Sequence, residues 1–164
     1  MARRVFFSFN YERDIFRVNT VRQSWLTQDR EAAGFWDASL WEKAKLQSEA
    51  AIKRMIDEGL KNTSVTAVLI GKETDGRPYV DYEIEQSLAV GNGILGVYIN
   101  GIKDARTQTM DSKGSNPLDR LTFSAKDSRH YPFSSYFVTY DWVKDDGYAN
   151  FGAWVEAAAK QRGR

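Results

Sequence analysis

Residues 65–99, VTAVLIGKETDGRPYVDYEIEQSLAVGNGILGVYI, decide the fold of this chain. The run Val65 to Ile70 is apolar and rich in β-branched residues, as in a strand buried on both faces. A polar loop follows, and from Pro78 onward apolar residues recur every four positions, which predicts one buried helix face. Two glycines end this helix before a second apolar run, Ile94 to Ile99. Strand, helix and strand in this order form a parallel βαβ unit.

The remaining sequence continues the alternation of strands and helices. We expect strands over Arg4 to Phe9, Phe35 to Ser39 (at an edge) and Tyr136 to Trp142, and helices over Glu12 to Gln28, Lys43 to Leu60 and Tyr148 to Ala158. Polar connections are expected at Asp29 to Gly34 and Gly101 to Arg120. The pattern predicts one α/β domain spanning residues 1–164, with a doubly wound, flavodoxin-like, five-stranded parallel sheet and helices on both faces.

Composition excludes several classes of chemistry. The chain has no cysteine and one histidine, so thiolate chemistry, disulfides and sites with several histidine ligands are ruled out. A formal net charge of +1, with both signs interspersed, gives no electrostatic case for nucleic acid or a membrane surface. No apolar run approaches the length of a membrane helix, and the N-terminal residues do not resemble a secretion signal. We therefore expect a cytoplasmic protein.

Glu83 is the candidate catalytic residue within the predicted helix. It follows Val80 by three positions and precedes Ile84, so it lies at the border of the buried stripe. A carboxylate there can face the cleft above the carboxyl ends of the strands, where open α/β sheets bind ligands. The alternative is an ordinary solvated glutamate, since Glu is common on helix surfaces.

Other motifs carry less weight. Gly91-Asn92-Gly93-Ile94-Leu95-Gly96 matches the dinucleotide fingerprint, but here a helix precedes the glycines and a strand follows them, which is the wrong order for binding a pyrophosphate. Gly71-Lys72 lacks the remainder of a P-loop. The first and third strands do not end in the aspartates that a phosphoacceptor receiver needs. His130, in a predicted loop, is interpreted as a surface residue.

Three stretches together resemble Toll/interleukin-1 receptor (TIR) domains. They are Phe6-Phe7-Ser8-Phe9-Asn10-Tyr11, Gly34-Phe35-Trp36-Asp37-Ala38-Ser39 followed by Trp41-Glu42, and Val68 to Gly71 followed by Pro78-Tyr79-Val80-Asp81-Tyr82-Glu83-Ile84. Further segments are similar to the TIR-like branch that contains ThsB of the bacterial Thoeris anti-phage system. These are Val5 to Phe9, Asp37 to Glu42, Asn62 to Thr66, Tyr140 to Val143 and Asp145 to Tyr148. The resemblance covers nearly the whole chain.

The resemblance implies cleavage of NAD⁺ between nicotinamide and ribose, with NAD⁺ as substrate and no further cofactor. ThsB-like proteins are expected to cyclise the remainder to an isomer of cyclic ADP-ribose, which activates a ThsA-type effector. A phage-derived activator and a homo-oligomer are further expected partners. The glutamate of the matching aromatic-Val-x-x-Glu-Ile run is Glu83, which the resemblance makes catalytic.

The residue types are compatible with this chemistry. Loss of nicotinamide leaves an oxocarbenium-like ribose, which a nearby carboxylate stabilises. We expect the aromatic rings of Phe7, Phe9 and Trp41 to offer flat surfaces for a base. The remaining substrate-binding candidates are polar: Ser8, Asn10, Asp37, Ser39 and Ser48. No metal is required.

Two other functions remain open. One is a non-catalytic TIR-like adaptor that binds proteins through the Asp37 to Lys45 loop and Trp41. The other is a nucleotide-binding module without turnover. Fold alone does not decide between these and an enzyme.

Overall fold

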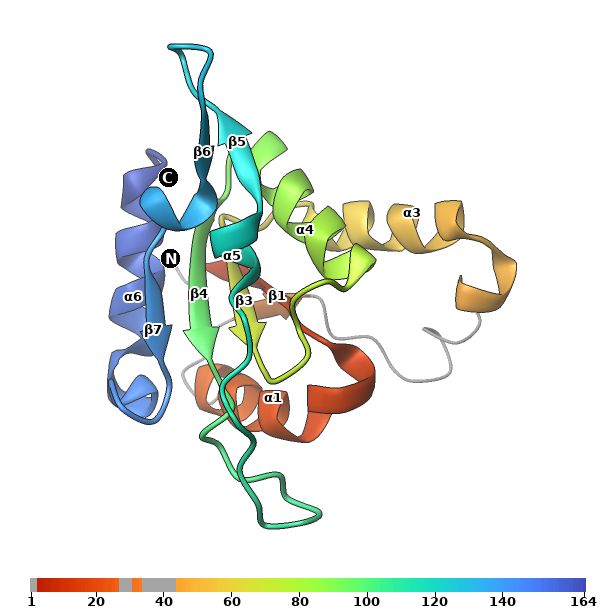
Figure 1. The fold of residues 1–164 in the computed structure, drawn as a ribbon, viewed down its shortest axis with the longest axis vertical. Coiled ribbons are helices and arrows are strands. Elements are labelled where there is room, and N and C mark those ends of the chain that lie inside the picture. The colour runs from red at the N-terminus through yellow and green to blue at the C-terminus, as the bar shows by residue number, and fades with distance from the viewer. Residues whose placement is uncertain (1–2, 27–30, 34–43) are drawn as a thin grey trace.

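A parallel sheet forms the centre of the molecule (Figure 1). The computed structural model describes residues 3–26, 31–33 and 44–164. Its five-stranded sheet has the order β2-β1-β3-β4-β7. The strands are β1 (Arg4–Ser8), β2 (Glu31–Ala33), β3 (Val65–Ile70), β4 (Gly93–Tyr98) and β7 (Thr139–Asp141), and every neighbouring pair runs parallel. The predicted βαβ unit is therefore present, with β3 and β4 adjacent.

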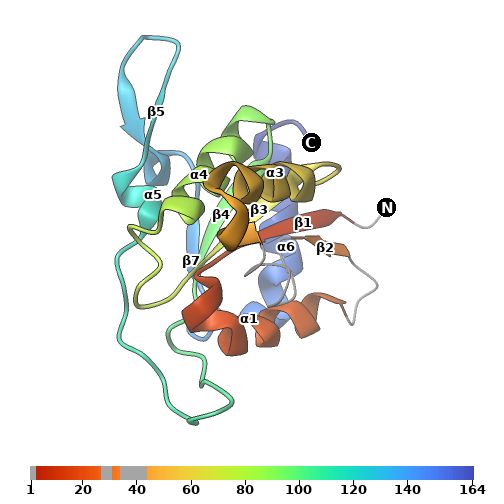
Figure 2. The same ribbon diagram turned by 90° about the vertical axis from the view of Figure 1, so that its right-hand side faces the viewer.

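Helices cover both faces of this sheet (Figure 2). On one face lie α1 (Tyr11–Leu26) and α6 (Gly147–Gln161), and on the other lie α3 (Glu49–Leu60) and α4 (Pro78–Ala89). The short helix α5 (Pro117–Arg120) and a 3₁₀ turn, Phe133–Ser135, pack beside α4. The expected doubly wound α/β architecture is confirmed. Among the described helices, none has the length and apolar character needed to cross a bilayer.

The side chains of β1 alternate between the two cores. Val5, Phe7 and Phe9 join the cluster under α1 and α6, whereas Phe6 packs in the cluster under α3. This is the period-two alternation of a strand buried on both faces. Ser8 shares the face of Phe6, so it points toward α3 and α4, and it is fully buried there.

Several predicted boundaries were wrong. The strand beside β1 at the edge is β2, within the stretch predicted as a polar connection, while the predicted strand over residues 35–39 lies outside the described residues. The helix predicted over residues 43–60 is interrupted at Ser48. A helical turn covers residues 44–47, and Ser48 then adopts an extended backbone, φ −177° and ψ 164°, as the N-cap of α3. A capping serine competes with helix continuation because its side chain binds backbone N–H groups.

A hairpin was also missed. β5 (Thr122–Ser124) pairs antiparallel with β6 (His130–Pro132), and the pair projects beyond the sheet (Figure 1). His130 thus lies on a strand and not in a loop, although it is exposed as expected. The last sheet strand, Thr139–Asp141, is shorter than predicted, and Tyr136, the predicted first residue, is instead the C-cap of the 3₁₀ turn Phe133–Ser135, with a helical backbone conformation.

The glycines after α4 terminate the helix, as the sequence predicted. α4 ends at Ala89, and Gly91 has a φ of +83°, a conformation that a glycine adopts without steric cost. β4 then begins at Gly93. The order of helix, glycines and strand confirms that this motif is not a dinucleotide-binding turn.

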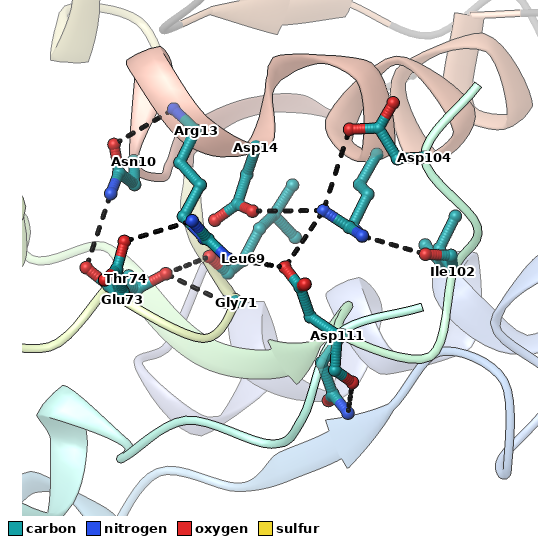
Figure 3. A network of polar contacts seen from close by, with 12 residues as sticks. Asn10, Arg13, Asp14, Leu69, Gly71, Glu73, Thr74, Ile102, Asp104 and Asp111 are labelled. Atoms are coloured by element: carbon teal, nitrogen blue, oxygen red, sulfur yellow. Dashed lines mark hydrogen bonds and ion pairs between the residues drawn. The ribbon is translucent and has the colours of Figure 1, made fainter. Parts of the chain in front are cut away.

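A buried ionic network joins α1 to the loops at the carboxyl ends of the strands (Figure 3). Arg17, on α1, is buried and donates from Nε to the Ile102 carbonyl at 2.9 Å and from Nη2 to the Thr109 carbonyl at 3.0 Å. Its Nη1 lies 3.1 Å from Oδ2 of Asp111. These contacts hold the irregular segment after β4 against α1.

Asp14 is the member of this network whose burial is energetically unfavourable. Its side chain is 0% exposed, and neither carboxylate oxygen has a hydrogen-bond partner among the described residues. Its nearest ionic partner is Nη1 of Arg17, at 3.8 Å. Burial raises the pKa of Asp14 to about 6, against the opposing effect of Arg17 and Arg13. Gly71 leaves the space for this carboxylate, because a Cβ at Gly71 would overlap it.

Close packing of β4 against α6 gives a prediction about stability. A Cβ at Gly93 would overlap the backbone carbonyl of Ala158 on α6, which cannot move aside as a side chain can. Gly93→Ala is expected to lower the free energy of unfolding by about 1–3 kcal/mol, as overpacking typically does. Urea denaturation measures this change.

Gly101→Ala is the matched control for this prediction. Its added methyl would meet only the side chain of Val143, at 3.2 Å from Cγ2, and Val143 is largely exposed and can shift. An equal loss of stability in both variants would contradict the proposed clash with α6.

Candidate active site

Glu83 is buried at the junction of α4 and β1. It lies in the second turn of α4, and its side chain is 5% exposed. Ser8, the last residue of β1, donates a hydrogen bond from Oγ to Oε1 of Glu83 at 3.0 Å. The interpretation of Glu83 as a solvated surface glutamate is therefore wrong.

A chain of hydroxyl groups holds the backbone of α4 beneath Glu83. Ser87, one turn further along the helix, donates from Oγ to the Glu83 carbonyl at 2.6 Å. The same Oγ is 2.6 Å from Oγ1 of Thr66 on β3. All three residues are buried, and such satisfied polar networks restrict side chains to one arrangement. This network sets the position of α4, and with it that of Glu83, relative to the sheet.

A cavity of about 310 Å³ opens beside the Glu83 carboxyl. Its walls come from the end of β1, the start of α1, the turn over residues 44–47 and the start of α4. The lining residues are Phe7, Phe9, Asn10, Tyr11, Glu12, Lys45, Arg77, Pro78, Tyr79, Val80 and Glu83. The cavity thus lies at the carboxyl end of β1, as expected for a ligand site in an open α/β sheet. A mostly apolar hollow with a few convergent polar groups is the usual form of a small-molecule site.

The environment of Glu83 changes its acidity. Burial raises the pKa of the Glu83 carboxyl to about 8, while the hydrogen bond from Ser8 acts in the opposite direction. In the protein alone the carboxyl is therefore mainly protonated at neutral pH. A cation brought next to it would favour the ionised form, so the charge of this group depends on what lies in the cavity. Carboxyls with such raised pKa values are concentrated at functional sites.

Charged residues lie at the mouth of the cavity. Nζ of Lys45 is 2.6 Å from Oε1 of Glu12, an ion pair that joins the turn over residues 44–47 to the start of α1. The hydrogen bond and charge of Lys45 lower the pKa of Glu12, and the charge of Arg77 adds a smaller effect in the same direction. Arg77 is exposed and immediately precedes α4.

The structure brings four of the predicted site residues to Glu83. Phe7, Phe9 and Asn10 line the cavity, and Ser8 contacts the carboxyl directly. The ring of Phe7 is fully buried and stacks on Phe151, with centroids 5.9 Å apart, so it also belongs to the core. The ring of Phe9 stacks on that of Tyr11 at 5.9 Å.

Ser48 is not part of the cavity lining. Its side chain accepts a hydrogen bond from the backbone N–H of Ala51 at 3.1 Å and so caps α3. This contact explains why a serine stands there. Three further predicted residues, Asp37, Ser39 and Trp41, lie outside the described residues, and so does most of the loop assigned to an adaptor surface. Their roles stay predictions.

Sequence reasoning missed several lining residues. Tyr11 and Glu12 begin α1, whereas Lys45 lies on the turn over residues 44–47, and no local pattern connects the two segments. Arg77 and Tyr79 flank Pro78, which the sequence did identify as the start of a helix. A cation just before a helix whose border glutamate faces a cleft is a signal that would have pointed to Arg77.

Within the described residues, no cluster of three or more His, Asp or Glu could hold a metal ion.

The raised pKa of the Glu83 carboxyl predicts how the stability of the protein depends on pH. Its pKa is about 8 in the folded protein and near 4.5 when unfolded, so the unfolded chain loses this proton first. The stability contributed by the protonated carboxyl is therefore full below pH 4.5 and is lost as the pH rises toward 8. Glu83→Gln has no carboxyl at this position and so does not lose stability in this way as the pH rises. The free energy of unfolding of Glu83→Gln, relative to that of wild type, should therefore increase from pH 5 to pH 9 by an amount on the order of a few kcal/mol.

Urea denaturation of both proteins at pH 5, 7 and 9 measures this difference. Comparing variants isolates Glu83, because the titration of Asp14 contributes equally to both. Glu85→Gln removes an exposed carboxylate from the same helix and should show a nearly constant difference. A difference for Glu83→Gln that stays constant, or that declines with pH, would disprove the assignment.

Comparison with known proteins identifies the family. The family model described as "Thoeris protein ThsB, TIR-like domain" matches residues 6–104, which include the end of β1 and all of β3, α4 and β4. The "Putative cyclic ADP-D-ribose synthase ThsB1" of Bacillus cereus (strain MSX-D12) is 43% identical over 192 residues, covering 94% of this chain and 100% of that protein. Ser8 and Glu83 both lie within the matched region. The chain belongs to the ThsB family of TIR-like domain proteins.

Proposed function

We propose that this protein cleaves NAD⁺ at the bond between nicotinamide and ribose and joins the remainder into an isomer of cyclic ADP-ribose. The single observation that carries the proposal is the buried Glu83 carboxyl facing a cavity at the carboxyl end of β1. The family membership and the name of the Bacillus cereus relative support the same reaction class.

Glu83 acts on the ribose in this proposal. Nicotinamide departs as a neutral molecule with the electron pair of its bond to ribose, which leaves an oxocarbenium-like sugar. The Glu83 carboxylate stabilises this developing positive charge in a site of low polarity, where electrostatic effects are strong. Ser8 holds Oε1 of Glu83 by its hydrogen bond and so fixes the direction of the carboxylate.

The protonation state of Glu83 follows the substrate. The nicotinamide ring of NAD⁺ carries a positive charge, and its arrival beside Glu83 lowers the pKa that burial had raised. The carboxyl then loses its proton as the substrate binds. After nicotinamide has left, an incoming hydroxyl forms the new bond to the sugar carbon and releases its own proton, which the carboxylate can accept.

The identity of the incoming hydroxyl determines the product. Attack by a hydroxyl of the same molecule closes a ring, whereas attack by water gives open ADP-ribose. Glu83 is nearly inaccessible to solvent, and Val80 and the aromatic side chains form apolar walls around the cavity. Exclusion of water from such a site favours the intramolecular attack.

The reaction implies a signalling role. We propose that a single domain acts on NAD⁺ in the cytoplasm, that a phage-derived activator starts it, and that a ThsA-type effector reads the product. The proposal includes a homo-oligomer, which a measurement of the mass in solution tests. Family membership supports the Thoeris assignment behind these partners.

Glu83→Gln tests the proposed reaction. The amide keeps the size and the hydrogen-bond acceptor but cannot carry a negative charge, so nicotinamide release should fall by at least roughly a hundredfold. The assay incubates each protein with NAD⁺, alone and after exposure to a lysate of phage-infected cells, and measures nicotinamide and the cyclic product by mass spectrometry.

Glu85→Gln, on the exposed side of the same helix, is the control and should retain full activity. Full activity in Glu83→Gln would remove the catalytic assignment. No nicotinamide release by wild type under either condition would contradict the enzymatic function and favour an adaptor or a binding module.

A further inference from the structure

Among the described residues, the lining of the Glu83 cavity carries one more positive than negative charge at its mouth. Three exposed charged side chains of the described lining lie there, and two of them, Glu12 and Lys45, form an ion pair at 2.6 Å. Arg77 contributes the third charge. The inner carboxyl of Glu83 is mainly protonated at neutral pH, so it does not offset Arg77. The described lining therefore favours an approaching anion.

The loop before α4 holds Arg77 in place. In this loop Gly71 donates from its backbone N–H to Oγ1 of Thr74 at 2.8 Å. Arg13, on α1, lies with Nη1 3.2 Å from Oε2 of Glu73 (Figure 3). The next residues lead directly into Arg77 and Pro78. The backbone of Arg77 is thus positioned before any ligand arrives.

Asn10 lies against the guanidinium of Arg77. In one orientation the Asn10 amide donates from Nδ2 to the Glu73 carbonyl at 3.3 Å. In the opposite orientation its oxygen accepts from Nε and Nη2 of Arg77 at 3.1 and 3.2 Å. The Asn10 side chain therefore lies within hydrogen-bond distance of the Arg77 guanidinium.

The start of α4 adds to the attraction for an anion. Arg77 is the N-cap of this helix, and its side chain makes no capping hydrogen bond to the first turn. Pro78, Tyr79 and Val80 of that turn line the cavity, so the positive end of the helix dipole lies at the same opening as the guanidinium.

We propose that Arg77 binds the diphosphate of the substrate and makes the site selective for a dinucleotide. The inference rests on the proposed function, in which Glu83 takes the nicotinamide-bearing ribose at the inner end. In NAD⁺ the diphosphate follows that ribose. A volume of about 310 Å³ is at the low end for a ligand site, so the diphosphate and the adenosine lie toward the mouth. A planar guanidinium binds phosphate oxygens through paired hydrogen bonds.

The proposal makes a specific distinction between ligands. Nicotinamide riboside contains the ring and the ribose that meet Glu83 but has no phosphate. ADP-ribose contains the diphosphate but lacks nicotinamide. Loss of the Arg77 guanidinium should therefore weaken the binding of ADP-ribose and NAD⁺ and leave the binding of nicotinamide riboside unchanged.

The test is calorimetric titration of Arg77→Gln and Arg77→Lys, with Glu83→Gln as the background whenever NAD⁺ is the ligand, to prevent turnover. Arg77→Gln is expected to weaken binding of NAD⁺ and ADP-ribose roughly tenfold to a hundredfold, as loss of a charge-assisted pair does. Arg77→Lys should recover part of this loss. Arg129→Gln removes a positive charge from the distant β5–β6 turn and should bind like wild type.

The outcomes separate this inference from the proposed reaction. Unchanged affinity for ADP-ribose in Arg77→Gln, or an equal loss for nicotinamide riboside, overturns the role of Arg77 even if NAD⁺ is cleaved. Weakened ADP-ribose binding in Arg77→Gln supports that role even if wild type releases no nicotinamide, in which case the reaction alone is disproved.

Discussion

The hydrogen bond between Ser8 and Glu83 is the contact on which the site depends. It joins the end of β1 to the second turn of α4, and it is the direct side-chain partner of a carboxyl that is almost completely removed from water. A buried carboxyl is costly when ionised, which is why its pKa is raised. A carboxyl that changes its charge with the arrival of a cation is suited to the proposed chemistry on a positively charged substrate.

The rest of the structure supports that contact from both sides. Alternation along β1 places Phe6 and Ser8 on the face of α3 and α4, while Phe7 and Phe9 anchor the strand in the opposite core. The hydroxyls of Thr66 and Ser87 then hold α4 on the sheet. The catalytic candidate therefore sits on regular, well-packed elements, which position a functional group more precisely than loops do.

The buried carboxylate of Asp14 is a second energetically unfavourable group, and it contacts the loops around the site. It lies beneath Gly71 and next to Arg17, which ties the segment after β4 to α1. The same end of α1 supplies Arg13 for the loop that leads to Arg77, and Glu12 for the cavity mouth. α1 thus connects the core to both the entrance and the neighbouring loops, and its charged residues are part of the architecture of the site.

The sequence by itself determined the βαβ unit, the doubly wound sheet and the burial border at Glu83, because the spacing of apolar residues records which faces of local elements meet the core. Resemblance to a family added the proposed catalytic role of Glu83. Only the tertiary structure decided that Ser8 contacts Glu83, that Ser48 caps a helix away from the cavity, and that Glu12, Lys45 and Arg77 meet at its mouth. These positions come from segments far apart in the chain, and periodicity within one segment carries no information about which partner a side chain finds across the fold.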